Sequence, residues 1–267
     1  MKTVVITGSA RGFGFEMNKL FLMNNCNVVL LDINEEELKR AKKELEDLNQ
    51  KGKVLSYKCD VTKEEDIDKT INNILKEVKA IDIWINNAGV NQPSKYIWEL
   101  QASDISRLID IDLKGTILCS NKIMNVMIKQ KQGQIYNVEG FGSDNAKMEK
   151  LSLYGTAKRG LTYFTEALAN EVKNYNNICV GKITPGIMIT NFIYTSLGDG
   201  EKIEIDEKTK KVYNILGDYP ETIAEFMVEK ILNNTKNNVK FTWLTKGRAF
   251  ARFLKAPFSK RDLFKGK

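Results

Sequence analysis

Tyr154 and Lys158 are the residues whose types and spacing point most directly to chemistry. They are four residues apart, so on a helix their side chains would share one face. A phenol can donate a proton to an oxygen that is gaining electrons, although its ordinary pKa of about 10 is high for this task. A neighbouring ammonium lowers that pKa. The pair therefore predicts acid–base chemistry on a hydroxyl or carbonyl, although such a pair also arises by chance.

Three glycines near the N-terminus indicate a second kind of chemistry. Gly8, Gly12 and Gly14 follow a short apolar run at 4–6, and Asp32 closes the next apolar run. In a dinucleotide site, glycines let the backbone approach the pyrophosphate, a helix N-terminus offers N–H groups, and a carboxylate accepts hydrogen bonds from a ribose. The spacing therefore predicts nucleotide binding rather than an ordinary turn.

Apolar runs that alternate with helical patterns must position these residues. We expect strands at 4–6, 28–31, 53–57, 81–85, 134–138, 178–183 and 239–244. We expect helices at 16–23, 35–48, 103–130 and 152–173, one after Val61 and one opened by Pro220. This rhythm predicts an α/β fold: a single-domain doubly wound parallel β-sheet, Rossmann-like, with helices on both faces and a basic C-terminal helical tail. We assign 1–235 to the dinucleotide-binding and catalytic domain, with a substrate loop at 187–218, and 236–267 to a basic amphipathic extension.

Composition excludes several classes of protein. The 267 residues include no histidine, which removes histidine bases, histidine-containing triads and histidine metal ligands, so we expect no metal site. Four widely spaced cysteines form no Cys-x-x-Cys motif and indicate reduced thiols: Cys26, Cys59, Cys119 and Cys179. No apolar run approaches the ~18 residues of a membrane span, and the N-terminus has no signal-peptide pattern. We therefore expect a cytoplasmic protein.

Positive charge is concentrated at the C-terminus. Residues 236–267 hold ten Lys and Arg and one acid, although the whole chain has a net charge of only +7. The first 235 residues are therefore slightly acidic, and we expect no nucleic-acid partner for them. In the extension, Phe250, Phe253 and Leu254 share one helical face and cations occupy the other. Such a segment either lies on an anionic membrane surface or packs as a terminal helix on its own subunit or a neighbouring one.

Four motifs in order give the chain a family resemblance. TGSARGFG at 7–14, NNAG at 86–89, Y-x-x-x-K at 154–158 and PG at 185–186 together resemble the short-chain dehydrogenase/reductase family. The resemblance implies an NAD(P)-dependent oxidoreductase that interconverts an alcohol and a ketone or aldehyde by hydride transfer. It implies that Tyr154 is the acid/base and that Lys158 tunes it and binds the nicotinamide ribose. It implies cofactor contacts at Gly8, Ser9, Arg11, Gly12, Phe13, Gly14, Asp32, Ile33, Asp60, Val61, Asn87, Ala88, Gly89, Tyr154, Lys158, Pro185, Gly186 and Ile187.

Two positions depart from the family pattern. Gly140 stands where the family has its catalytic serine, so we consider Ser143 or a protonated Glu139 as the orienting donor; alternatively, Ser143 is a solvated loop residue. The segment NVEGFGS at 137–143 resembles the chlorophyll b reductase branch of the family. Asp112 replaces the usual Asn, which puts the proton relay in doubt. Asp112 could pair with Lys158 or merely cap a kink in the long helix.

The cofactor and the substrate are predicted less sharply. Asp32 would bind both ribose hydroxyls of NAD and repel a 2′-phosphate, which favours NAD, although Arg11 keeps NADP possible. An apolar mouth, or else a lid with its own core, is expected from Tyr96, Trp98, Ile187, Met188, Ile189, Phe192, Ile193, Tyr194 and Leu197. The mouth would suit a lipophilic small molecule. The long helix at 103–130 favours a homodimer or homotetramer. The alternative function is a nucleotide-binding sensor or scaffold with little turnover.

Overall fold

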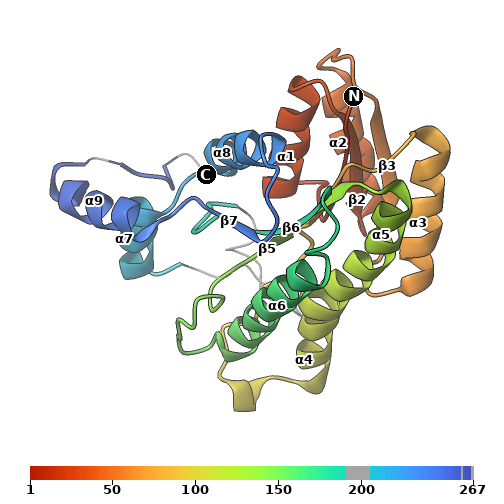
Figure 1. The fold of residues 1–267 in the computed structure, drawn as a ribbon. Coiled ribbons are helices and arrows are strands. Elements are labelled where there is room, and N and C mark those ends of the chain that lie inside the picture. The colour runs from red at the N-terminus through yellow and green to blue at the C-terminus, as the bar shows by residue number, and fades with distance from the viewer. Residues whose placement is uncertain (191–204, 260, 266–267) are drawn as a thin grey trace.

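One parallel sheet forms the centre of the molecule. The computed structural model describes residues 1–190, 205–259 and 261–265 (Figure 1). Seven strands pair in the order β3-β2-β1-β4-β5-β6-β7, and every pairing is parallel. They are β1 (Thr3–Thr7), β2 (Asn27–Asp32), β3 (Val54–Lys58), β4 (Ile83–Asn86), β5 (Gly133–Val138), β6 (Ile178–Thr184) and β7 (Val239–Thr242). The strand order reverses between β1 and β4, and the crevice outside the carboxyl ends at such a point is where α/β sheets bind ligands.

Helices cover both faces of the sheet. They are α1 (Gly12–Met23), α2 (Glu35–Glu46), α3 (Glu64–Glu77), α4 (Ala102–Ile109), α5 (Thr116–Gln130), α6 (Ser152–Glu171), α7 (Glu207–Leu216), α8 (Pro220–Leu232) and α9 (Lys246–Lys255). Figure 1 shows α1 beside α8 on one side of the sheet, with α3, α5 and α6 on the other. Val4 and Ile6 belong to the core on the side of α1 and α8, and Val5 belongs to the core on the side of α3, α5 and α6. Burial on both faces explains why the strands are continuous apolar runs, and the predicted fold class is confirmed.

Two predicted helices differ in their detail. The first begins at Gly12 rather than at residue 16, because the glycine turn is completed within the first helical turn. The predicted long helix at 103–130 is α4 and α5 joined by a π-helical segment, Asp110–Gly115. A π turn inside a helix commonly marks a functional site. Asp112 lies in this segment.

The C-terminal third contains more regular structure than we predicted. Helix α7 occupies part of the segment 187–218, which we expected to be a substrate loop. Strand β7 lies inside the range 236–267 and pairs with β6, so the sheet continues past residue 235. The four cysteines are free and buried. Within the described residues, none of the helices is long and apolar enough to cross a bilayer, and no cluster of His, Cys, Asp and Glu has the form of a metal site.

Candidate active site

The glycine loop is a cradle built by close backbone packing. Gly8 and Gly12 have φ values of +59° and +58°, which residues other than glycine rarely adopt. A Cβ at Gly8 would lie 2.6 Å from the Cα of Ala88, and one at Gly14 would lie 2.8 Å from the carbonyl oxygen of Gly8. Helix α1 begins at Gly12, and no described side chain caps its first turn. These N–H groups fit a pyrophosphate, so the residues present suit a dinucleotide.

The NNAG segment is held directly against this loop. The Thr7 hydroxyl accepts hydrogen bonds from the backbone N–H groups of Asn87 and Ala88, both at 3.0 Å. The Asn87 side chain donates to the carbonyl oxygens of Thr7 and Gly8, at 3.0 and 2.8 Å. The predicted contact residues of the first and fourth strands therefore meet, although they are about eighty residues apart in sequence.

Asp32 ends β2 beside the loop. Its carboxylate accepts hydrogen bonds from the N–H groups of Ala10, at 3.2 Å, and Asn34, at 3.1 Å. The Arg11 guanidinium is mostly exposed and lies 3.8 Å from the Glu37 carboxylate. Ile33 is exposed next to Asp32. This corner of the cradle therefore contains two carboxylates, and both Arg11 and Arg40 lie within 4.0 Å of Glu37.

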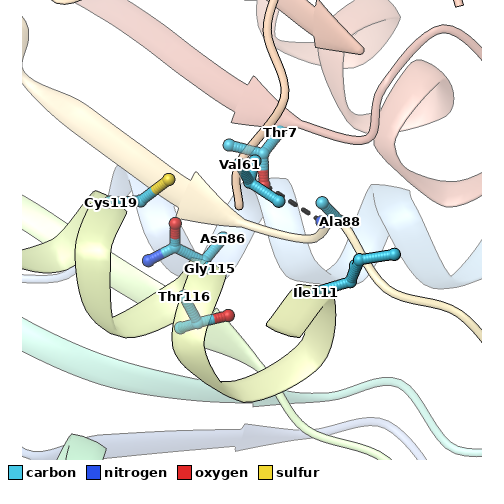
Figure 2. Close-up of a pocket in the computed structure, with 8 residues that line it drawn as sticks. All are labelled: Thr7, Val61, Asn86, Ala88, Ile111, Gly115, Thr116 and Cys119. Atoms are coloured by element: carbon cyan, nitrogen blue, oxygen red, sulfur yellow. Dashed lines mark hydrogen bonds between the residues drawn. The ribbon is translucent and has the colours of Figure 1, made fainter. Parts of the chain in front are cut away.

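A small pocket lies between the ends of β1 and β4 and helix α5 (Figure 2). It has no room for even a water molecule, so a dinucleotide would lie across the loop instead. The lining residues are Thr7, Val61, Asn86, Ala88, Ile111, Gly115, Thr116 and Cys119. Burial raises the pKa of Asp60, next to Val61, but hydrogen bonds from Thr62 outweigh this and hold it below its usual range.

Tyr154 and Lys158 lie on α6 with their side chains buried against the end of β5. They are 8% and 6% exposed, and the Lys158 ammonium lies 5.5 Å from the centre of the Tyr154 ring. A Cβ at Gly140 would lie 2.3 Å from the Tyr154 hydroxyl oxygen. The hydroxyl is therefore directed at the position of the family's serine, and Gly140 makes room for it.

The ionisation of Tyr154 differs from our simple expectation. Burial raises the pKa of the phenol, Lys158 lowers it, and Asp112 raises it again. The net direction is upward from the ordinary value of 10. The lowering effect that we predicted for the ammonium is present, but it is outweighed.

Asp112 pairs with Lys158 inside the protein. Its Oδ2 lies 3.0 Å from the Lys158 Nζ, and its Oδ1 accepts a hydrogen bond from the Val90 N–H at 2.7 Å. Asp112 has no exposed surface. Burial lowers the pKa of Lys158, but Asp112 and Tyr154 raise it above its usual value. Of the two alternatives for Asp112, the structure contains the ion pair.

Ser143 and Glu139 are both engaged in structural contacts. Ser143 is buried, and its hydroxyl accepts from the Gly140 N–H at 3.3 Å and donates to the Lys158 carbonyl at 3.4 Å. It is not a solvated loop residue, and its role as an orienting donor stays a prediction. Glu139 accepts from the hydroxyls of Thr162 and Thr184, at 2.8 and 2.7 Å.

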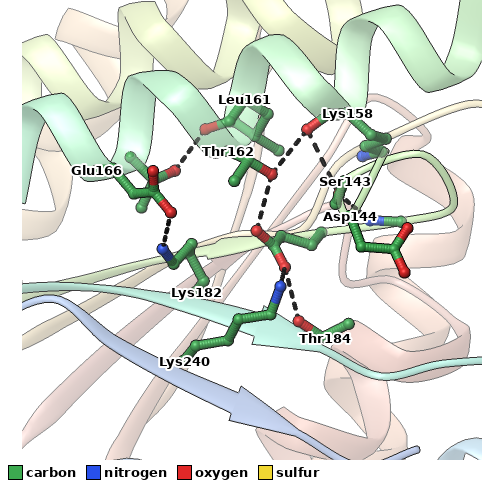
Figure 3. Close-up of polar contacts among 12 residues, drawn as sticks. Ser143, Asp144, Lys158, Leu161, Thr162, Glu166, Lys182, Thr184 and Lys240 are labelled. Carbon is green, nitrogen blue, oxygen red and sulfur yellow. Dashed lines mark hydrogen bonds and ion pairs between the residues drawn. The ribbon is translucent and has the colours of Figure 1, made fainter. Parts of the chain in front are cut away.

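A third donor completes the surroundings of Glu139. The Lys240 Nζ lies 2.7 Å from its carboxylate. Figure 3 shows Thr162, Thr184 and Lys240 converging from α6, β6 and β7. Three donors face its two oxygens, so Glu139 acts as an acceptor that ties these elements together. Its alternative role as an orienting donor stays a prediction.

One positioning residue is missing from the sequence predictions. Gln92 is 1% exposed, and its side-chain oxygen accepts from the N–H groups of Leu153 and Tyr154, both at 3.0 Å. It therefore caps the start of α6 and sets the helical turn that carries Tyr154. Gln92 is about sixty residues away and belongs to no local capping motif, so no sequence signal indicated this contact.

The segment after β6 carries several of the residues that we expected either at a substrate mouth or in a lid with its own core. Gly186 has a φ of +79°, and a Cβ there would lie 2.8 Å from the Leu244 Cβ. Ile189 is buried at 1% exposure, so it packs as core. Tyr96 stacks on Trp98 with ring centres 4.8 Å apart, and Trp98 is 78% exposed. The mouth residues Phe192, Ile193, Tyr194 and Leu197 lie outside the described residues.

Comparison with known proteins agrees with this arrangement. Residues 2–197 match the family model of short chain dehydrogenases. The chain therefore belongs to the short-chain dehydrogenase/reductase family, whose members are NAD(P)-dependent oxidoreductases. Within that family it is related to the chlorophyll b reductase branch, as the NVEGFGS segment predicted.

Two relatives and one solved structure of the same fold illustrate these similarities. The chain is 32% identical over 246 residues to the probable chlorophyll(ide) b reductase NYC1 of Oryza sativa subsp. japonica. The alignment covers 86% of this chain and 47% of that protein. It is 31% identical to carbonyl reductase family member 4 of Xenopus tropicalis, covering 84% of this chain and 88% of that protein. The crystal structure of levodione reductase superposes with a TM-score of 0.80 at 21% identity, covering 94% of this chain and 98% of that one. The chain spans about half the length of the NYC1 relatives that it matches.

Proposed function

We propose that this protein interconverts an alcohol and a carbonyl on a lipophilic small molecule, with NAD(P) as the hydride carrier. The observation that carries the proposal is the Tyr154 hydroxyl, directed at Gly140 at the end of β5, with Lys158 and Asp112 behind it. This end of β5 belongs to the same sheet edge as the glycine cradle. An acid and a dinucleotide cradle at one edge are the parts that such a reaction needs.

Each residue has a distinct task in this proposal. The glycine loop and the start of α1 would hold the pyrophosphate, Asp32 the adenosine ribose and Lys158 the nicotinamide ribose. When bound, the cofactor supplies or accepts the hydride. Tyr154 donates a proton to the substrate oxygen, and Lys158 stabilises the phenolate that remains. Because burial raises the pKa of Tyr154, the phenol keeps its proton near neutral pH, so we expect carbonyl reduction to be the faster direction there.

We propose that NAD is preferred over NADP. The Asp32 carboxylate is held in place by two backbone N–H groups, and Glu37 lies close to Arg11, the cation that could have met a 2′-phosphate. A phosphate in this corner would face two carboxylates, and like charges at short range repel strongly.

A lipophilic substrate is the class that we propose. Ile187 and Met188, partly exposed, follow β6 beside the site, and apolar side chains line most small-molecule sites. Two relatives are named for chlorophyll(ide) b and for carbonyl compounds. The first assays therefore use chlorophyllide b and a series of lipophilic ketones and aldehydes.

Turnover of these compounds is followed by NADH absorbance. Tyr154→Phe is expected to reduce kcat at least about a hundredfold while leaving NADH affinity within a factor of two, because the proton donor is removed but the cradle is intact. Tyr163→Phe is the matched control, since Tyr163 is on the same helix and is 74% exposed. Unchanged turnover in Tyr154→Phe would refute the role of the phenol.

A nucleotide-binding sensor or scaffold is the second candidate. It is favoured by Gly140 in place of the serine and by Asp112, whose charge offsets that of Lys158. Tight NADH binding by fluorescence, together with no turnover across the panel, would support it. The cytoplasmic location and the homodimer or homotetramer stay predictions; sedimentation velocity tests the latter.

A further inference from the structure

Helix α9 turns its charged side toward the protein. The Arg248 guanidinium lies 3.8 Å from the centre of the Trp243 ring and donates to the Trp243 carbonyl at 2.7 Å. Arg252 donates to the Leu216 carbonyl at 2.9 Å and lies 2.7 Å from the Asp218 carboxylate. An amphipathic helix on a globular protein ordinarily packs its apolar side inward. Here the arrangement is reversed.

The opposite side of α9 is an exposed apolar face. Phe250, Phe253 and Leu254 are 66%, 50% and 61% exposed, and Phe258, in the following turn Ala256–Phe258, is 90% exposed. We call these four residues the aromatic face. Figure 1 shows α9 beside α7 at the outer end of the molecule, away from the sheet. Exposed apolar groups gathered in this way mark an interaction site.

This orientation is secured by several contacts to the body. The Asp218 carboxylate also accepts from the Trp243 indole at 2.6 Å and pairs with Arg261. Leu263 is 3% exposed, and its N–H donates to the Asn214 side chain at 2.7 Å. The chain is therefore tied down before and after α9, and the aromatic face is presented by a fixed helix.

The charges around the face identify what it would contact. From Lys246 to Phe258 the sequence has no acid. Of its four cations, Arg248 and Arg252 face the protein, and Lys246 and Lys255 are exposed. Two copies of this face would bring like charges together, which disfavours self-association. A bilayer with anionic lipids offers both an apolar layer and the opposite charge. We propose that the aromatic face docks on an anionic bilayer surface, with its four apolar side chains in the boundary between headgroups and acyl chains.

The proposal describes a protein that lies on the membrane surface, and it does not depend on the proposed enzymatic activity. The test is cosedimentation of the full chain with vesicles of phosphatidylcholine, with and without phosphatidylglycerol. We expect binding to the anionic vesicles and weak binding to the neutral ones. Added salt should weaken the binding, because the attraction between Lys246, Lys255 and the lipid is screened.

Two variants separate the apolar and the charged contributions. Phe250→Ser/Phe253→Ser/Phe258→Ser should lower vesicle partitioning at least about tenfold, because the inserted side chains are lost. Lys246→Glu/Lys255→Glu should remove the preference for anionic vesicles. Tyr163→Ser on α6 replaces an exposed aromatic residue elsewhere and should leave partitioning unchanged. Circular dichroism checks that each variant is folded.

Three outcomes would overturn the proposal. One is the absence of wild-type binding to anionic vesicles, and another is equal partitioning of the wild type and the triple serine variant. The third is a wild-type oligomer in sedimentation velocity that the triple variant loses, combined with no vesicle binding. That result would make the aromatic face an interface between copies of this chain.

Discussion

The two halves of the sheet edge are built on different physical principles. The nucleotide half, at the ends of β1, β2 and β4, is held by backbone contacts. Its Gly8 and Gly14 lie where an added Cβ would come within 3 Å of neighbouring atoms, and Asn87 donates hydrogen bonds to Thr7. The catalytic half, between β5, β6 and α6, is held by buried charged groups, chiefly Asp112, Lys158 and Glu139. The first half depends on the absence of side chains, and the second on the pairing of side chains.

This difference determines how each half responds to change. A buried ion pair loses much of its value when one partner is removed, because the other charge remains without compensation. A backbone cradle does not depend on a buried ion pair, but it cannot accept an extra Cβ. Substitutions of these two kinds should therefore distinguish the halves. Gly140 is a position where the catalytic half also needs a glycine.

Gly140→Ser is expected to have the largest effect. The new Cβ would lie 2.3 Å from the Tyr154 hydroxyl, so the phenol must move, and a displacement of about 1 Å costs roughly a hundredfold in rate. We therefore expect kcat to fall about a hundredfold, although the substitution installs the family's usual residue. Gly247→Ala is the control, because nothing lies within 4 Å of a Cβ there. Increased activity in Gly140→Ser would contradict the assigned position of the phenol.

Gly14→Ala tests the nucleotide half. Its Cβ would lie 2.8 Å from the Gly8 carbonyl oxygen and 2.9 Å from the Ser9 Cα, so the cradle must open. We expect the KM for NADH to rise by about tenfold, with a loss of about 1–3 kcal/mol in the free energy of unfolding. Steady-state kinetics and denaturant titration measure the two effects. A fall in kcat with an unchanged KM would show that the halves are not separate.

The same division explains what could be predicted from the sequence. The strands were predictable because both faces of the sheet are covered, so Val4, Val5 and Ile6 form an unbroken apolar run. The glycine loop and the pair on α6 are also local patterns, with spacings set by one turn or one helix. Helix α7 was not predicted, because its first five residues are polar and its apolar residues lie only in its second half.

Contacts between distant segments could not be predicted in this way. Gln92 accepts a hydrogen bond from the N–H of Tyr154, about sixty residues away on α6. Asp218 forms ion pairs with Arg252 and Arg261 of the extension. The π turn that carries Asp112 has no sequence pattern of its own. In each case the partner of a polar side chain is decided by tertiary packing, and a single sequence does not contain that information locally.

Asp32→Ala examines one of the two carboxylates to which we assign the selectivity of the nucleotide half. Removing it should raise the kcat/KM ratio of NADPH to NADH by about tenfold, since a repulsion of roughly 1.4 kcal/mol is relieved. Glu36→Ala is the control, because Glu36 is a neighbouring, highly exposed carboxylate. No change in the ratio would contradict the proposed preference for NAD.

Asp112→Asn should produce the smallest effect, a shift along the pH axis. Asp112 raises the pKa of Tyr154, so removal of its charge should lower that pKa. Alcohol oxidation requires the phenolate, and its rate should therefore reach half of its maximum at a lower pH than in the wild type. Carbonyl reduction requires the protonated phenol, so its rate should begin to decline at a lower pH as well.

The control for this shift lies in the same π-helical segment. Asp110 is 42% exposed at its side chain and pairs with Lys114 at 3.3 Å, so Asp110→Asn removes an equal charge near the site but outside its buried network. Its pH profile should match that of the wild type, because solvent screens an exposed charge. A shift to higher pH in Asp112→Asn, or equal shifts in both variants, would mean that the buried pair does not control the phenol. The catalytic half would then depend on its packing, as the nucleotide half does.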